Sequence, residues 1–151
     1  MAAEMGDVLE DFELSDQEGE KVRLSDFRGK RVLLSFHPLA WTGICTKQMQ
    51  ALEEAMDRID SLGVVPLGLS MDAVPSKKAW ADDMGLERLR ILSDFWPHGE
   101  VARSADIFVE KLGFSGRGNI ALDEEGRVIM RKIYEIKELP DLEEVLAELS
   151  G

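Results

Sequence analysis

The sequence predicts an α/β fold made of one domain that spans residues 1–151. Short apolar runs bounded by turn residues alternate along the chain with segments whose apolar residues recur at helical spacing. Two patterns typical of β-hairpins flank this alternating part. With 151 residues, of which 44% are hydrophobic, the chain is long enough and apolar enough to bury the core of a single domain.

The first hairpin pattern precedes residue 31. Residues 11–30, "DFELSDQEGEKVRLSDFRGK", predict two short strands around an Asp-Gln-Glu-Gly turn, with a second turn at Arg-Gly-Lys. The next run, "RVLLSF" from Arg31 to Phe36, is apolar and bounded by turn residues. It therefore predicts a strand that is buried on both of its faces.

A helix is expected after residue 43, and Gly63 marks its end. Its apolar residues recur mostly at helical spacing: Ile44, Met49, Leu52, Met56, Ile59 and Leu62. The other expected elements are a strand at 64–72, a helix from Pro75 to Gly85, a strand at 88–95, a short helix within 98–108, a hairpin at 118–134 around Asp-Glu-Glu-Gly, and an amphipathic helix that begins at Pro140 and Asp141 and carries Leu142, Val145, Leu146 and Leu149 on one face.

Strands interleaved with helices imply a largely parallel central sheet flanked by helices on both faces. The last hairpin is antiparallel, so the sheet is mixed. This order of elements fits a thioredoxin-like fold with an N-terminal β-hairpin extension. Fold alone does not identify a function.

The composition excludes several classes of function. A net charge of −12 argues against general binding to nucleic acid or to an anionic membrane surface. No apolar run approaches the ~18 residues of a membrane span, and the acidic N-terminus lacks a signal-peptide pattern. The chain has one cysteine, so we expect no internal disulfide, no structural metal site and a cytoplasmic location.

The one cysteine, Cys45, lies between the predicted strand and the helix that follows, within three residues of both threonines in the chain, Thr42 and Thr46. The first turn of a helix has free backbone N–H groups and a favourable dipole, which stabilise a thiolate. Pro38 constrains the chain as it leaves the strand, and Gly43 allows another molecule to approach the backbone. The Thr42 hydroxyl is expected to cap the helix or to face the sulfur. The alternative is that Cys45 is a small buried apolar residue and Thr42 an ordinary N-cap.

The spacing Pro-x-x-x-Thr-x-x-Cys in "PLAWTGIC" resembles the signature of peroxiredoxins, and the resemblance extends over nearly the whole chain. It includes "GDVLEDFELSDQEGEKVRLSDFRGKRVLLSF", "LSDFWPHGEVA" and "GRGNIALDEEGRV" in the same order. The greatest similarity is to the one-cysteine, alkyl hydroperoxide reductase E-like type of the AhpC/TSA superfamily. The sequence departs from that pattern at Leu9-Glu10, where Ala-Pro is usual, and at Gln48, where glutamate is common.

The resemblance implies a role for each matching residue. Cys45 is the expected peroxidatic thiolate, Thr42 the residue that holds the peroxide, and Pro38 the residue that shields the sulfur. Arg117 is expected to stabilise the thiolate and the transition state, and Gln48 to tune the local charge. Trp41, Gly43 and Ile44, in the same loop, are the expected substrate contacts.

The implied activity is a thiol-dependent peroxidase that reduces hydrogen peroxide and organic hydroperoxides without a metal or organic cofactor. Oxidation of Cys45 to sulfenic acid calls for an external thiol reductant, such as thioredoxin, glutaredoxin or a low-molecular-weight thiol. A homodimer or a higher homo-oligomer is expected, with Phe95 and Trp96 as candidate contacts. The alternative function is a non-enzymatic redox sensor or holdase on the same fold. A dithiol oxidoreductase is rejected because the motif holds one sulfur.

Overall fold

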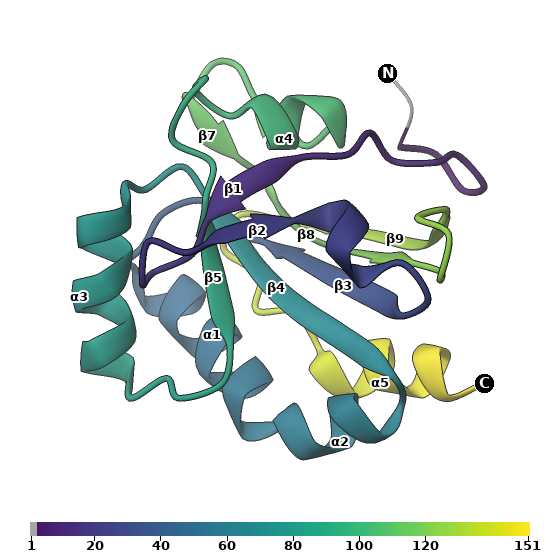
Figure 1. Cartoon of the computed structure of the whole chain (residues 1–151). Coiled ribbons are helices and arrows are strands. Elements are labelled where there is room, and N and C mark those ends of the chain that lie inside the picture. The colour runs from purple at the N-terminus through teal and green to yellow at the C-terminus, as the bar shows by residue number, and fades with distance from the viewer. Residues whose placement is uncertain (1–2) are drawn as a thin grey trace.

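The computed structural model describes residues 3–151, and these residues form one seven-stranded sheet, a separate two-stranded hairpin and the helices around them (Figure 1). In chain order the elements are β1 (Glu13–Ser15), β2 (Lys21–Arg23), the 3₁₀ helix η1 (Leu24–Phe27), β3 (Arg31–Phe36), α1 (Gly43–Glu54), α2 (Met56–Ser61), β4 (Val64–Ser70), α3 (Val74–Met84), β5 (Arg90–Ser93), α4 (Glu100–Ser104), β6 (Phe108–Val109), β7 (Phe114–Ser115), β8 (Arg117–Leu122), β9 (Val128–Tyr134) and α5 (Leu142–Ser150). The predicted α/β class is confirmed.

The strand order in the sheet is β2-β1-β5-β4-β3-β8-β9, which places β3 near the centre. β3 pairs in parallel with β4 and antiparallel with β8. The sheet is mixed, as predicted, but only β3, β4 and β5 run parallel to one another. Fewer strand pairs are parallel than antiparallel, because the N-terminal hairpin joins the same sheet through the antiparallel pairing of Ser15 with Ser93.

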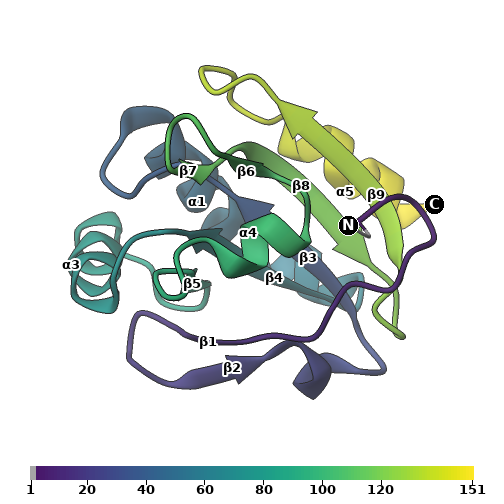
Figure 2. The same ribbon diagram turned by 90° about the horizontal axis from the view of Figure 1, so that it is seen from above.

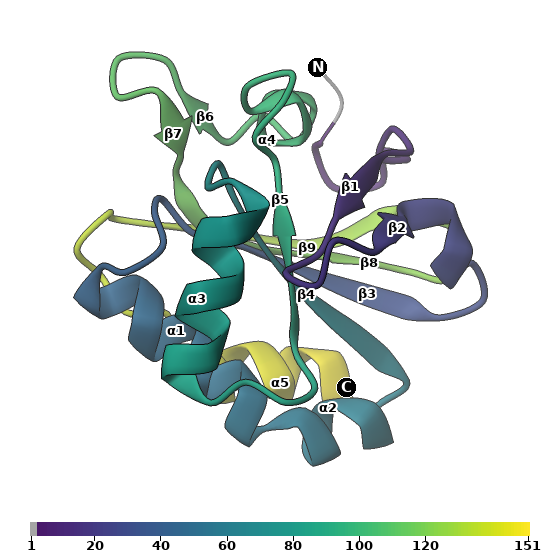
Figure 3. The same cartoon turned by 60° about the vertical axis from the view of Figure 1, so that its left-hand side comes forward.

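The two faces of the sheet are covered differently (Figure 3). Helices α1, α2, α3 and α5 all lie on one face, whereas α4 and the β6–β7 hairpin lie on the other. Successive side chains of β3 point to opposite faces of the sheet, so this strand contributes to both buried clusters. One cluster contains Val32, Leu34 and Phe36, and the other contains Leu33. Cys45 lies in the cluster on the helical face.

Two local features differ from the sequence-based expectation. The single helix expected before Gly63 is divided into α1 and α2 at Ala55, where ψ is 8°, although the sequence has no proline or glycine there to signal a break. The β6–β7 hairpin was not predicted, since two-residue strands are too short to show alternation. Other boundaries follow the local signals closely: Gly85 ends α3 with a φ of 73°, and the carboxylate of Asp141 accepts from two backbone N–H groups at the start of α5.

The N-terminal segment runs beside the β8–β9 hairpin before it reaches β1 (Figure 2). Val8 forms an isolated bridge with Arg127, and the N–H of Gly6 donates to the carbonyl of Val128 at 2.8 Å. Within residues 3–151, no helix has the length and apolar character needed to cross a membrane.

Candidate active site

Cys45 lies in the first turn of α1 and is completely buried, with 0% of its surface exposed. The loop that carries it begins at His37, directly after β3, and Thr42 occupies the N-cap position with an extended backbone. The predicted placement of the thiol, between a buried strand and the start of a helix, is confirmed. The unpaired N–H groups and the positive end of the α1 dipole therefore lie near the sulfur.

Arg117 reaches Cys45 from the first position of β8. Its Nη1 atom donates to Cys45 Sγ at 3.4 Å, although the two residues are 72 positions apart in the chain. The antiparallel register, which pairs Gly118 with Phe36, places the start of β8 beside the end of β3, where the cysteine loop begins. The guanidinium is also held by the carbonyl of Ile136, which accepts from Nε at 2.9 Å and from Nη2 at 2.7 Å. Arg117 is thus a buried, oriented cation next to the thiol.

Gln48 links this cation to the sheet. Its Oε1 accepts from Nη1 of Arg117 at 2.7 Å, and its Nε2 donates to Ser35 Oγ at 2.8 Å and to the carbonyl of Phe36 at 3.2 Å. The amide uses both its acceptor and its donors, which also defines its orientation. The predicted tuning residue therefore contacts the same guanidinium nitrogen that contacts Cys45.

The two threonines have different contacts. The Thr42 hydroxyl donates to the carbonyl of Leu39 at 2.9 Å and makes no capping hydrogen bond to α1. The Thr46 hydroxyl donates to the carbonyl of Thr42 at 2.8 Å and accepts from Nε1 of Trp80 at 3.1 Å. Thr42 is exposed, whereas Thr46 links the first turn of α1 to α3 through Trp80.

A pocket of about 350 Å³ opens beside this site. It is lined by Pro38, Leu39, Thr42, Gly43, Ile44, Phe114, Arg117, Ile136 and Lys137. The structure therefore brings together five of the residues expected from the sequence, and a Cβ added at Gly43 would meet nothing within 4 Å. Trp41 is not part of this lining: its φ is 73°, it is 52% exposed, and its indole N–H donates to Ser76.

Four lining residues were not expected from the sequence: Leu39, Phe114, Ile136 and Lys137. Leu39 lies inside "PLAWTGIC", so the motif itself could have indicated it. Phe114 lies three positions before Arg117, but its place depends on the β6–β7 hairpin. Ile136 and Lys137 follow β9 and carry no local signal of function.

The loop that carries the thiol is anchored from the neighbouring strand. Asp72 follows β4, and its Oδ2 accepts from the backbone N–H of Ala40 at 2.8 Å and from the Ser70 hydroxyl at 2.6 Å. Because β4 is parallel to β3, both strands end at the same edge of the sheet. The carboxylate therefore holds the middle of the loop in place.

The charged group in contact with the sulfur is the guanidinium of Arg117. Burial, and then the nearby charges of Lys77 and Arg117, hold the pKa of His37 well below its ordinary value, so this imidazole is neutral at neutral pH. His37 packs against Trp80 with ring centroids 5.4 Å apart. Arg117 is the cation in contact with the thiol, and the buried Lys77, whose pKa burial lowers to about 7, was not singled out by the sequence.

Comparison with known proteins shows what this chain is similar to. The model of the AhpC/TSA family matches residues 5–131. Alkyl hydroperoxide reductase E of Mycobacterium tuberculosis is 35% identical over 138 residues, which cover 91% of this chain and 90% of that protein. Peroxiredoxin Bcp of Escherichia coli is 43% identical over 89 residues, which cover 59% of this chain and 56% of that protein.

A solved structure supports the same assignment. The crystal structure of peroxidoxin BcpB from Mycobacterium tuberculosis matches with a TM-score of 0.84 and 26% identity, over 99% of this chain and 97% of that chain. The expected thioredoxin-like architecture is therefore confirmed. Because the family model and the reductase both match most of the sequence, the chain belongs to the AhpC/TSA family.

Proposed function

We propose that this protein is a one-cysteine, thiol-dependent peroxidase that uses Cys45 as its nucleophile. The observation that carries the proposal is the contact of Arg117 Nη1 with Cys45 Sγ, 3.4 Å long, behind a pocket whose lining includes Arg117. The name of curated relatives that are 35% identical over 91% of this chain, alkyl hydroperoxide reductase E, supports the same reaction class.

In the proposed reaction the Cys45 thiolate attacks one oxygen of the peroxide. An S–O bond forms, the O–O bond breaks, and the second oxygen leaves with the electron pair and takes up a proton from water. The sulfur is oxidised by two electrons to sulfenic acid, and the peroxide is reduced to water or an alcohol. Arg117 and the N–H groups of the first turn of α1 stabilise the charge that develops on the leaving oxygen.

The pocket suits a substrate that carries an apolar group. Pro38, Leu39, Ile44, Phe114 and Ile136 supply apolar side chains, whereas Arg117 and Lys137 supply positive charge. An alkyl group bound there would gain roughly 25 cal/mol for each Å² of apolar surface removed from water. Organic hydroperoxides therefore fit this site, as does hydrogen peroxide. Since Cys45 is completely buried, the peroxide reaches the sulfur only when the lining moves slightly.

Recycling requires a second thiol, and no other cysteine lies within these 151 residues. The sulfenic acid condenses with an external thiol to give a mixed disulfide and water, and a further thiol releases Cys45. Thioredoxin, glutaredoxin and low-molecular-weight thiols are the candidate reductants. A chain with a single cysteine that must stay reduced to act fits a cytoplasmic location, where thiols are kept reduced.

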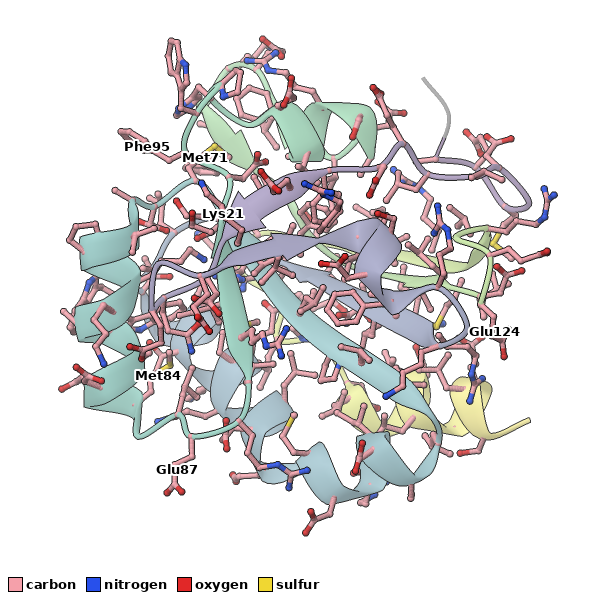
Figure 4. All side chains as sticks on the ribbon, viewed as in Figure 1. Lys21, Met71, Met84, Glu87, Phe95 and Glu124 are labelled. Carbon is pink, nitrogen blue, oxygen red and sulfur yellow. The ribbon has the colours of Figure 1, made fainter. Side chains whose placement is uncertain are left out.

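We expect a homodimer that forms through the loop between β5 and α4. Phe95 and Trp96 in this loop are 53% and 79% exposed, and Figure 4 shows Phe95 pointing away from the body of the protein. Exposed aromatic side chains of this size are common at protein contacts. A second copy of the chain is the expected partner.

Steady-state consumption of hydrogen peroxide and an alkyl hydroperoxide, with each class of thiol reductant, tests the proposed function. The wild-type protein is expected to turn over many times, and Cys45→Ser to be inactive with an unchanged circular dichroism spectrum. Oxidation of Cys45 once, without turnover with any thiol, would contradict the peroxidase and favour a redox sensor. Full activity of Cys45→Ser would exclude the nucleophile.

A further inference from the structure

Arg117 is held from two sides, one buried and one exposed. On the buried side its Nη1 atom donates to Gln48, a residue that is 4% exposed. On the other side Nε and Nη2 both donate to the backbone carbonyl of Ile136, at 2.9 and 2.7 Å. Ile136 follows β9 and lies in an exposed turn. The orientation of this buried cation therefore depends on a segment at the surface of the protein.

The turn that carries this carbonyl spans residues 135–138, between β9 and α5, and Figure 2 shows the loop projecting beyond the end of β9. One residue closes the turn twice. The backbone N–H of Glu138 donates to the carbonyl of Glu135 at 3.0 Å. In return, Oε1 of Glu138 accepts from the backbone N–H of Glu135 at 3.2 Å. Both hydrogen bonds join the ends of the turn and so constrain its central residues, Ile136 and Lys137.

An exposed four-residue turn does not keep one shape by itself. A large share of such turns lack the hydrogen bond between their first and last residues, because water competes for both groups and ordering the backbone costs entropy. A carboxylate that accepts from a backbone N–H adds a stronger, charge-assisted hydrogen bond. Opening of the turn would move the Ile136 carbonyl and take it away from two nitrogens of the Arg117 guanidinium.

We propose that Glu138 is a positioning residue of the peroxidase reaction, whose carboxylate closes the turn at 135–138 and so holds the Ile136 carbonyl against Arg117. This inference rests on the proposed function, which assigns to Arg117 the stabilisation of the thiolate and of the leaving oxygen. Glu138 touches neither the sulfur nor the pocket lining. It acts through one hydrogen bond at the surface, which keeps the buried guanidinium in its orientation.

Three variants separate the hydrogen bond of Glu138 from its charge. Glu138→Ala removes both the acceptor and the charge, whereas Glu138→Gln removes the charge and keeps a side-chain oxygen that can accept from Glu135. Glu135→Ala is the matched control: it removes the same charge from the same turn but keeps the backbone N–H and carbonyl through which Glu135 is bonded. All four residues of the turn are exposed, so each variant is expected to fold, which circular dichroism checks.

The first readouts are the stopped-flow rate of Cys45 oxidation by hydrogen peroxide and the thiolate absorbance as a function of pH. In Glu138→Ala the oxidation is expected to be about threefold slower, and the thiolate to form at a pH about half a unit higher, because Arg117 is less well held. Glu138→Gln and Glu135→Ala should follow the wild type. Loss of a carboxylate charge alone would favour the thiolate, which is the opposite direction. Wild-type behaviour of Glu138→Ala, or an equal loss in Glu138→Gln or Glu135→Ala, would overturn the proposal.

A second measurement follows the contact itself and uses no peroxide. Proton–nitrogen NMR records how fast the Nε–H of Arg117 exchanges with water, and the signal is assigned by its absence in Arg117→Lys. Because this N–H donates to the Ile136 carbonyl, its exchange is expected to be about fivefold faster in Glu138→Ala and unchanged in Glu138→Gln and Glu135→Ala. Equal exchange rates in all four proteins would exclude the positioning role. Faster exchange in Glu138→Ala, in a protein that does not turn over peroxide, would support the contact and contradict the proposed function alone.

Discussion

Arg117 and Gln48 are joined by the same guanidinium nitrogen that contacts the thiol. Nη1 of Arg117 donates to Gln48 Oε1 at 2.7 Å and to Cys45 Sγ at 3.4 Å. The position at which this sequence departs from the usual glutamate is therefore a direct partner of the cation that we propose stabilises the thiolate. The neutral amide leaves the positive charge of Arg117 uncompensated on that side.

Gln48→Glu is expected to reduce the thiolate fraction and slow the reaction with peroxide near neutral pH. A carboxylate would bring a negative charge within about 7 Å of the sulfur, which amounts to roughly 2 kcal/mol at an effective dielectric constant of ~20. A stronger attraction between the carboxylate and Arg117 offsets part of this, so the pH at which the thiolate forms should rise by about one unit or less.

The measurement is the thiolate absorbance as a function of pH. Gln50→Glu, which adds the same charge elsewhere on α1, serves as the control. Thiolate formation at a lower pH in Gln48→Glu would show that glutamate acts mainly by positioning Arg117.

Arg117→Lys is expected to lower kcat/KM about a hundredfold while the fold is retained. Lysine keeps the charge, but it cannot hold the carbonyl of Ile136 with two nitrogens and reach Gln48 and Cys45 with a third. Steady-state kinetics and circular dichroism check this. Arg127→Lys changes an exposed arginine of the β8–β9 hairpin and should leave the rate unchanged. Wild-type kinetics in Arg117→Lys would mean that charge alone suffices.

Substitution of Thr42 should lower the activity, whereas substitution of Thr46 should lower the stability. Thr42→Val removes the hydroxyl of a residue that lines the pocket, and we expect at least a tenfold slower reaction, with Thr42→Ser close to the wild type. Thr46→Val leaves the indole N–H of Trp80 without its acceptor. It should cost about 1 kcal/mol of unfolding free energy with little effect on the rate. Stopped-flow oxidation and urea denaturation of all three variants decide this; a rate loss confined to Thr46→Val would reverse the assignment.

Lys77 should make the stability depend on pH in a defined direction. The pKa of Lys77 is about 7 in the folded protein, against 10.5 for an ordinary lysine, so the unfolded chain binds more protons between these values. The free-energy cost of burying the charged Lys77 side chain is complete below about pH 7 and disappears as the pH rises toward 10.5. The unfolding free energy therefore increases with pH in that window. In a Cys45→Ser background, which removes the thiol, Lys77→Met should abolish this increase. It should also stabilise the protein near pH 6, by at most a few kcal/mol. Urea denaturation at several pH values measures it, and parallel curves for both proteins would contradict the prediction.

Trp96→Ser is expected to weaken self-association without changing the fold, because this side chain is 79% exposed in the loop after β5. Sedimentation velocity over a range of concentrations should show a dimer for the wild type and a shift toward monomer for the variant. Trp41→Ser removes another exposed aromatic residue, outside this loop, and should leave the dimer intact. A wild-type protein that is monomeric at every concentration would rule out the interface.

Local signals in the sequence determined the elements that hold the nucleophile. The apolar run from Arg31 to Phe36 is a strand with those bounds, and the following helical spacing places Cys45 in a first turn. Helix boundaries such as Gly85 follow from backbone conformation, since glycine adopts a positive φ without strain. Thr42 and Pro38 could be predicted because they lie in the same loop as the thiol. Arg117 could be assigned only through resemblance to a family, as nothing near it in the chain indicates a sulfur.

Only the tertiary structure decided which distant residues meet at that thiol. Arg117 reaches Cys45 because β8 pairs antiparallel with β3, and Phe114 reaches the pocket through a hairpin too short to predict. The sequence predicts Trp41 as a substrate contact; in the structure this residue has a positive φ, its indole N–H donates to Ser76, and it does not line the pocket. Lys77 has the sequence context of an ordinary surface lysine, yet it is fully buried. The spacing of residues along the chain predicts which side chains share one face of a helix or strand. Burial and charge pairing depend instead on packing between elements that are far apart in the sequence.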